Sequence, residues 1–150
     1  MNCPEWFKYV ACVIVCNSQG DIFLGKRRNG EAEAGKWAIL GGSGTFEESQ
    51  DRRDFAKREL KYDVHLKINL DNLKLFTTLM LYLPEYSLLI EDYFYYQENG
   101  IVQVTKNKKA PAEGRWFSIK EIQEMAGRDE IAFDNYKMLK LFEKQVLNLS

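Results

Sequence analysis

The sequence has little that would indicate disulfide bonds or export. Its three cysteines, Cys3, Cys12 and Cys16, are odd in number and lack the paired spacing of a metal site. The start, MNCPEWFKYV, has no basic stretch followed by the apolar core of a signal peptide. We therefore expect a reduced, cytoplasmic protein in which Cys12 and Cys16 pack as small apolar residues.

Long apolar runs and an excess of one charge are also missing. The stretch YVACVIVC has only eight residues before Asn17, whereas a helix that spans a bilayer needs about 20. The formal net charge of -1 argues against a protein that binds nucleic acid by neutralising many phosphates. We expect no membrane association and no stable nucleic-acid complex, and any contact with phosphate has to be local.

The 150 residues present, 45% hydrophobic and 29% charged, are typical of one soluble domain with its own core, spanning residues 1–150. Apolar runs between turn residues predict strands. These lie at residues 8–16, 21–27, 36–40, 73–84, 86–97 and 114–119. The first two form a hairpin around the turn NSQG.

Helical periodicity predicts three helices, at residues 51–63, 120–127 and 132–147. The core-facing side of the last is expected to contain Phe133, Tyr136, Leu139, Phe142 and Val146. Strands mixed with helices in this way predict an α+β fold, an α/β/α sandwich in which helices cover both faces of a mixed sheet.

Two acidic residues of the first helix point to metal chemistry. Glu59 and Asp63 are four residues apart, which places their Cβ atoms about 6 Å apart on one helix face. Mg²⁺ or Mn²⁺ would offset the repulsion between them, because both ions prefer carboxylate, carbonyl and water oxygens. The alternative is a solvated helix face neutralised by Lys57, Arg58 and Lys61.

The turn before this helix makes the metal interpretation more specific. Gly41 and Gly42 let the backbone approach a ligand closely and offer a carbonyl oxygen. Glu48 brings a third carboxylate to the start of the helix. A double glycine, an isolated acid and an acidic helix together predict a site where cations hold a diphosphate.

The stretch GGSGTFEESQDRRDFAKRELKYD resembles the Nudix box of the MutT-like nucleoside diphosphate-X hydrolases. Gly42 and Glu48 keep that family's first spacing, and Arg58, Glu59 and Leu60 supply its Arg-Glu-aliphatic block. Similar flanking stretches, FLGKRRNGEAEAGKWAILGG, APAEGRWFSIKEI and IAFDNYKMLK, extend the resemblance over nearly the whole chain.

The box departs from the family pattern at several positions. Nine residues, in place of seven, separate Glu48 from Arg58, so Gln50 competes with Glu48 for the position of the isolated acid. Tyr62 and Asp63 stand where the family has a pair of glutamates. Two extra residues inside the helix would rotate Glu59 by about 200°, so we expect them in the preceding loop.

The resemblance implies a Mg²⁺ (or Mn²⁺) site made by Gly42, Glu48, Glu59 and Asp63, with Arg58 orienting the acids by a salt bridge. It also implies hydrolysis of a nucleoside diphosphate linked to another group, with a nucleoside triphosphate or NDP-sugar as substrate. Two alternatives stay open. One is a fold that binds a nucleotide or a partner with weakened catalysis, and the other is a GDP-mannose-type glycosyl hydrolase.

Other residues have weaker signals, each with a structural alternative. Glu113 would complete the metal site or serve as general base, or else be a solvated loop residue. Arg27 and Arg28 would hold substrate phosphates, or else be surface charges at a strand end. Trp37 would stack on a base, although core packing is favoured, and the single histidine, His65, is expected to be structural. The partner is a small nucleotide, and a homodimer is left open.

Overall fold

The computed structural model describes residues 7–44, 51–84 and 87–148, and its strands form one mixed sheet. The strands in chain order are β1 (Phe7–Cys16), β2 (Ile22–Lys26), β3 (Trp37–Ala38), β4 (Leu40–Gly44), β5 (Lys74–Tyr82), β6 (Leu88–Gln97) and β7 (Glu113–Phe117). The path across the sheet is β3-β2-β1-β6-β5, while β4 pairs with β1 and β7 with β2. Strand β1 runs parallel to β6 along its full length and antiparallel to β2 and β4.

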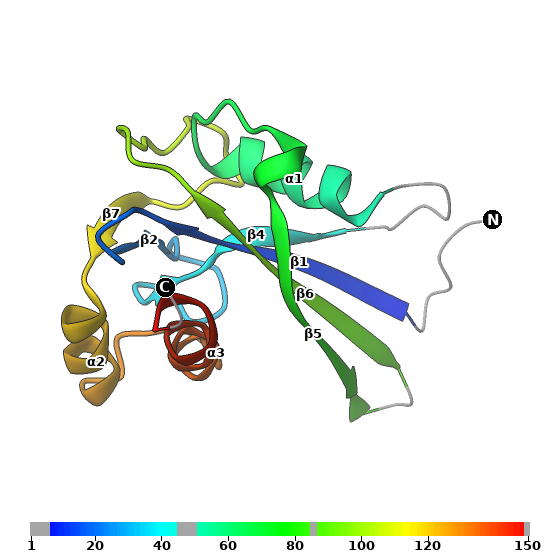
Figure 1. Ribbon diagram of the computed structural model, residues 1–150. Helices are drawn as coiled ribbons and strands as arrows, with labels where there is room; N and C mark the ends of the chain where they lie inside the picture. Colours follow the sequence, from blue (N-terminus) through cyan, green and yellow to red (C-terminus); the bar gives the residue numbers. More distant parts are fainter. Residues whose placement is uncertain (1–6, 45–50, 85–86, 149–150) are drawn as a thin grey trace.

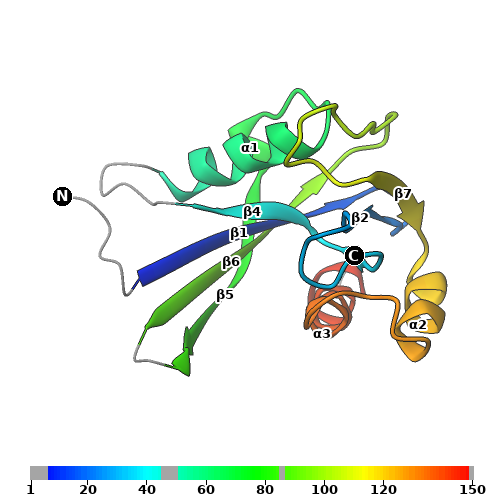
Figure 2. The same cartoon turned by 180° about the vertical axis from the view of Figure 1, so that it is seen from behind.

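Helices lie on both faces of this sheet. Helix α1 (Arg52–Asp63) covers one face, and α2 (Ile119–Gly127) and α3 (Asn135–Phe142) cover the other, as Figure 1 and the reverse view in Figure 2 show. A 3-10 turn at Leu70–Asn72 precedes β5, and a π turn at Glu143–Leu147 extends α3. This arrangement confirms the predicted α+β fold with helices on both faces.

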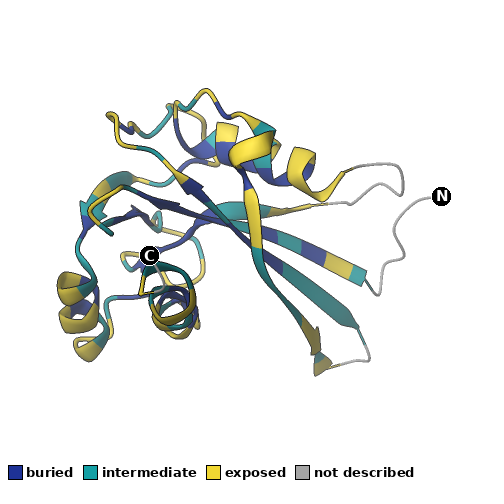
Figure 3. Ribbon diagram, in the orientation of Figure 1, coloured by how far each residue is buried: buried dark blue, intermediate teal, exposed yellow. Residues whose placement is uncertain are grey.

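Two hydrophobic clusters account for the layering. Alternate residues of β1 face opposite sides, as the pleat of a strand requires. Ala11 and Val13 pack with Phe55 and Leu60 of α1, whereas Ile14 joins a cluster under α2 and α3. Figure 3 shows the buried residues along the inner strands and the exposed ones on the outer sides of the helices. Each face of the central strand therefore holds one layer of helices.

The predicted hairpin is confirmed, and the strands predicted at residues 73–84 and 86–97 pair with each other. Strands β1 and β2 pair antiparallel, with Val15 opposite Phe23, around a turn that closes at Gly20 with φ +83. Strands β5 and β6 pair antiparallel from Lys74 opposite Tyr95 to Tyr82 opposite Leu88. Among the described residues, no helix combines the length and the apolar composition needed to cross a membrane.

The start of the last helix differs from the prediction. Helix α3 begins at Asn135 and not at residue 132. Phe133 adopts a left-handed backbone conformation with φ 52, which is incompatible with a helix at that position. Phe133 is 54% exposed, so its predicted core position is wrong. Met138 packs in the core beside Leu139 and Phe142.

Candidate active site

Helix α1 brings two buried carboxylates to the double glycine of β4. Glu59 is 7% exposed and Asp63 is 5% exposed. The Asp63 Oδ2 accepts a hydrogen bond from the Gly41 N–H at 2.9 Å. The Glu59 carboxylate occupies the position that a side chain on Gly42 would need. The two acids therefore converge at the glycines, as the helix spacing predicts.

Both glycines are required by this geometry. Gly41 has φ +143, and a Cβ there would collide with the carbonyl oxygen of Ala11 in the neighbouring strand. A Cβ on Gly42 would collide with Glu59. Glycine avoids both contacts because it has no Cβ and adopts positive φ readily. The sequence Gly41-Gly42 is therefore what lets helix α1 press its acids against β4.

The electrostatics of this site are unfavourable for two free negative charges. Burial raises the pKa of Asp63 to about 7, and repulsion from Glu59 and Glu31 acts in the same direction. The Gly41 N–H and the cation of Arg27 lower that pKa but do not cancel the effect of burial. A cation placed between the acids would relieve this cost.

The raised pKa of Asp63 predicts a pH-dependent stability in the metal-free protein. Because the folded-state pKa is about 7, above the ordinary value of 3.8, the folded protein binds more protons than the unfolded chain between these values. Stability should therefore fall as pH rises across that window, by on the order of 2–4 kcal/mol. The measurement is thermal unfolding in EDTA from about pH 4.5 to pH 7.5.

The control is Asp63→Asn, because its amide oxygen still accepts from the Gly41 N–H but does not titrate. We expect this variant to lose most of the downward slope. Equal slopes in the two proteins would show that Asp63 does not hold a proton in this range.

Arg58 contacts the acid next to it in sequence. Its Nη2 lies 3.3 Å from Glu59 Oε1, and its guanidinium lies 4.7 Å from the ring centroid of Phe55. Phe55 is fully buried under the helix. The ring and the carboxylate together fix the direction of the Arg58 side chain. Arg58 is therefore close enough to Glu59 to orient its carboxylate.

Among the described residues, Glu113 does not form a group with these two acids. Glu113 begins β7 opposite Lys26, and its Oε1 is 2.7 Å from Arg115 Nη2. Glu48 and its competitor Gln50 lie outside the described residues. Within residues 7–44, 51–84 and 87–148, no three acidic, histidine or cysteine side chains form a group that could hold a metal ion.

Tyr62 stands between the two acids in the helix sequence and faces a basic loop. The Lys109 ammonium lies 5.2 Å from the centroid of the Tyr62 ring. The Thr105 hydroxyl donates to the Tyr62 carbonyl oxygen. This contact ties the end of α1 to the segment that contains Lys109.

The predicted substrate-binding residues have different surroundings. Arg27 pairs with Glu31 at 3.2 Å, and its guanidinium lies 5.1 Å from the ring centroid of Phe133. Arg28 donates through Nε to the carbonyl oxygen of Ala110. Trp37 is 9% exposed and packs against Phe117. This placement of Trp37 matches core packing, the favoured alternative.

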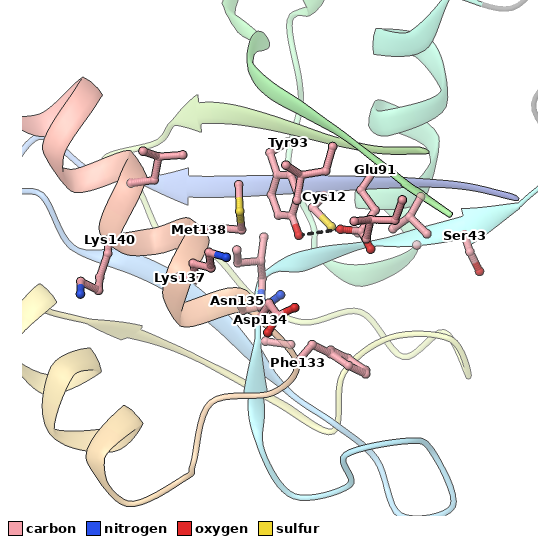
Figure 4. Close-up of a pocket in the computed structure, with 18 of the residues that line it drawn as sticks. Cys12, Ser43, Glu91, Tyr93, Phe133, Asp134, Asn135, Lys137, Met138 and Lys140 are labelled. Carbon is pink, nitrogen blue, oxygen red and sulfur yellow. Dashed lines mark hydrogen bonds between the residues drawn. The ribbon is translucent and has the colours of Figure 1, made fainter. Parts of the chain in front are cut away.

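A cavity of about 920 Å³ adjoins the double glycine, between the sheet and α3 (Figure 4). Its walls include Gly41, Gly42 and Arg27. A smaller hollow of about 40 Å³ beside Asp63 is also lined by Gly41 and Arg27. The large cavity falls in the size range of ligand sites, roughly 300–1,000 Å³. Gly41 and Gly42 therefore contact the carboxylate pair and also line the large cavity, whose lining does not include Glu59 or Asp63.

No pattern in the sequence predicts this cavity. Its walls come from β1, β4, β5, β6 and α3, and no local pattern shows that these segments enclose a space. The one available signal was the spacing of Lys137, Lys140 and Lys144, which puts three cations on one side of the last helix. All three line the cavity.

A mixed sheet between two helical layers, with an acidic helix pressed on a double glycine beside a large cavity, defines a Nudix-type fold. The chain belongs to this family, because the family model for the NUDIX domain matches residues 6–142. This confirms the resemblance seen in the box and its flanks. A comparison with curated proteins finds no match.

Solved structures show the same fold at low sequence identity. The MutT protein from Methanosarcina mazei Go1 superposes with a TM-score of 0.70 at 16% identity, over 93% of this chain and 94% of that one. A bifunctional NMN adenylyltransferase/ADP ribose pyrophosphatase from Francisella tularensis, complexed with AMP and Mn ion, has a TM-score of 0.65 at 16% identity, over 95% of this chain and 42% of that one. A C. elegans Ap4A hydrolase gives 0.59 at 12% identity, over 93% and 98%.

Proposed function

We propose that this protein hydrolyses the pyrophosphate link of a nucleoside diphosphate joined to another group, in the class of nucleoside triphosphates or NDP-sugars. The observation that supports this most directly is the convergence of buried Glu59 and Asp63 on Gly41 and Gly42, at the edge of a cavity of about 920 Å³. The fold similarity to an ADP ribose pyrophosphatase and an Ap4A hydrolase gives further support.

The acidic pair fits a magnesium or manganese site that the substrate completes. Mg²⁺ in such sites is commonly held by one or two carboxylates, several waters and the phosphates of the substrate. Glu59 and Asp63 would supply the two carboxylates, and a carbonyl of Gly41 or Gly42 and the Glu48 side chain are candidates for further ligands. When bound, the cation neutralises diphosphate charge and lowers the pKa of an attached water.

The remaining steps are assigned to this chain's own side chains. Arg58 holds Glu59 in place through their 3.3 Å contact. Arg27 lines both the large cavity and the hollow beside Asp63, so we assign it to the substrate phosphates, with Arg28 as its neighbour. Glu59 is the proposed general base for the attacking water, and Glu113 is the alternative.

A nucleotide panel tests this proposal. The purified protein is incubated with nucleoside triphosphates, ADP-ribose and GDP-mannose, with and without Mg²⁺ or Mn²⁺, and products are separated by ion-exchange chromatography. We expect release of a nucleoside monophosphate only with the metal. Reaction in ¹⁸O-labelled water distinguishes the mechanisms, because attack on phosphorus labels a phosphate and attack on a sugar carbon labels the sugar.

A second candidate function is nucleotide binding with weakened catalysis. It is favoured by Tyr62, which replaces an acid of the box and contacts Lys109 through its ring. This candidate predicts no turnover in the panel but a higher melting temperature with nucleotide. Absence of both responses would contradict both candidates.

Replacing Tyr62 by an acid should strengthen metal binding. Tyr62→Glu adds a carboxylate between Glu59 and Asp63 in the helix, so we expect Mg²⁺ to bind about 10-fold more tightly by isothermal titration calorimetry. The matched control is Tyr62→Gln, which has the same shape as the glutamate without its charge. Equal affinities in the two variants would show that position 62 does not face the cation.

A further inference from the structure

The large cavity contains a carboxylate in a mostly apolar wall. Glu91 of β6 lines it, together with Cys12 of β1 and Tyr93, two residues further along β6. The Tyr93 hydroxyl donates to Glu91 Oε2 at 3.0 Å, and Figure 4 shows these two side chains beside Cys12. Apolar residues of the same cavity wall include Val10, Leu79, Met138 and Leu141. Acceptor oxygens therefore stand among apolar residues, where a polar group without a hydrogen-bond partner is costly.

The neighbours of Glu91 give it one fixed donor. Burial raises the pKa of Cys12 to about 12 and also raises the pKa of Tyr93, so both groups keep their protons. The Tyr93 hydroxyl, which also interacts with the Cys12 thiol, donates to the carboxylate and so orients the Glu91 side chain. The second oxygen, Oε1, is not engaged by this contact.

Cations near the cavity do not neutralise Glu91. Lys137, Lys140 and Lys144 line the cavity from α3 and its extension, but the ion pairs found among the described residues do not include one with Glu91. A carboxylate has about four acceptor positions and no donor. Glu91 is therefore suited to a ligand that presents two N–H groups side by side on different nitrogen atoms.

Among the common nucleobases, guanine alone meets this requirement. Its Watson–Crick edge offers N1–H and N2–H₂ side by side, which match the two oxygens of a carboxylate. Adenine and cytosine place an acceptor nitrogen next to their amino group, and uracil and thymine have one N–H between two carbonyl oxygens. A base that does not pair with Glu91 would leave the carboxylate oxygens without water and without a hydrogen-bond donor. The cost of removing that water disfavours binding of the wrong base.

We propose that Glu91, held by Tyr93, makes the cavity selective for guanine nucleotides. This inference rests on the proposed nucleotide chemistry of the same site and adds the identity of the base. Glu91 is then a specificity-determining residue that contacts the base, whereas Glu59 and Asp63 act at the phosphates. The cavity volume of about 920 Å³ leaves room for a whole nucleoside.

The test measures binding without turnover. GMP, IMP and AMP lack a pyrophosphate link, and IMP differs from GMP only by the missing 2-amino group. Calorimetric titration in Mg²⁺ buffer should show GMP binding about 10-fold more tightly than IMP, and more tightly still than AMP. Equal affinities for GMP and AMP, or no binding of GMP, would overturn the proposal.

Variants test whether Glu91 is responsible. Glu91→Gln keeps the side-chain shape but presents one acceptor and one donor, which pair with N6–H₂ and N1 of adenine. We expect the GMP affinity to fall at least about 10-fold and the preference over AMP to disappear. Glu124→Gln, an exposed change on α2, should change neither. An unaltered GMP preference in Glu91→Gln would also overturn the proposal.

These outcomes separate the two proposals. Tight GMP binding with no hydrolysis of any nucleotide would contradict the proposed hydrolase and support the guanine selectivity. Equal hydrolysis and binding of all bases would contradict the selectivity and support the hydrolase. Melting curves of each variant confirm that the chain is folded before binding is interpreted.

Discussion

Glu59→Gln is expected to lower turnover of a pyrophosphate substrate at least about 100-fold, the scale of a lost general base. Glu59 is 7% exposed and its side chain fits against Gly42, so the isosteric amide should occupy the same space. What the variant loses is the negative charge that would hold a cation or accept a proton. Steady-state kinetics over a range of Mg²⁺ concentrations give the measurement.

The matched control is Lys61→Gln, an exposed change two residues further along the same helix. Both variants alter one charge of α1, but only Glu59 contacts the double glycine. We expect the control to keep its rate to within about threefold, as exposed changes away from a site usually do. If Glu59→Gln keeps its rate and its metal dependence, Glu59 is not part of the reacting site.

The local geometry of the acidic site could be predicted because one helix determines it. Residues four apart in a helix share a face whatever the rest of the chain does, so Glu59 and Asp63 had to lie together. Glycine at both 41 and 42 indicated that another group approaches the backbone closely. The structure shows that this group is the Glu59 carboxylate at Gly42, whereas at Gly41 it is the carbonyl oxygen of Ala11.

The cavity and its specificity residue could not be predicted in the same way. Strand periodicity puts Glu91 and Tyr93 on one face of β6, but it does not say whether that face meets a helix or a space. That depends on how α3 sits across β5 and β6, which is decided by the whole core. The position of Phe133 could not be predicted either. Its spacing places it on the core-facing side of the last helix, but its left-handed backbone conformation keeps it out of that helix.

A buried network that anchors α1 was also missing from the sequence analysis. Asp92 of β6 is fully buried on the sheet face under α1. It accepts hydrogen bonds from Arg52 Nε at 2.6 Å, from Thr78 Oγ1 at 2.6 Å and from the Tyr9 hydroxyl. Burial favours protonation, yet these donors bring the pKa of Asp92 below its ordinary value. The first residue of α1 is thus joined to three strands.

Arg52→Met is expected to lower the free energy of unfolding by about 2–3 kcal/mol, because it leaves the Asp92 carboxylate buried without its cation. This loss is smaller than the loss expected when a fully buried ion pair is broken, because 45% of the Arg52 side chain is exposed. The control is Arg53→Met at the next position, where the pair with Asp51 is exposed on both sides. We expect that control to change stability by less than about 0.5 kcal/mol. Urea unfolding at neutral pH measures both.

The pH dependence distinguishes a lost ion pair from lost packing. Because the folded-state pKa of Asp92 lies below its ordinary value of 3.8, its stabilisation is present above that value and is lost as pH falls through the lower folded-state pKa. The difference between wild type and Arg52→Met should therefore shrink below about pH 4. A penalty that stays constant with pH, or one equal to that of Arg53→Met, would contradict the ion pair as the anchor of α1. The helix that positions Glu59 and Asp63 would then depend for its attachment to the sheet on its apolar residues, such as Phe55 and Leu60, and on the hydrogen bond between Asp63 and Gly41.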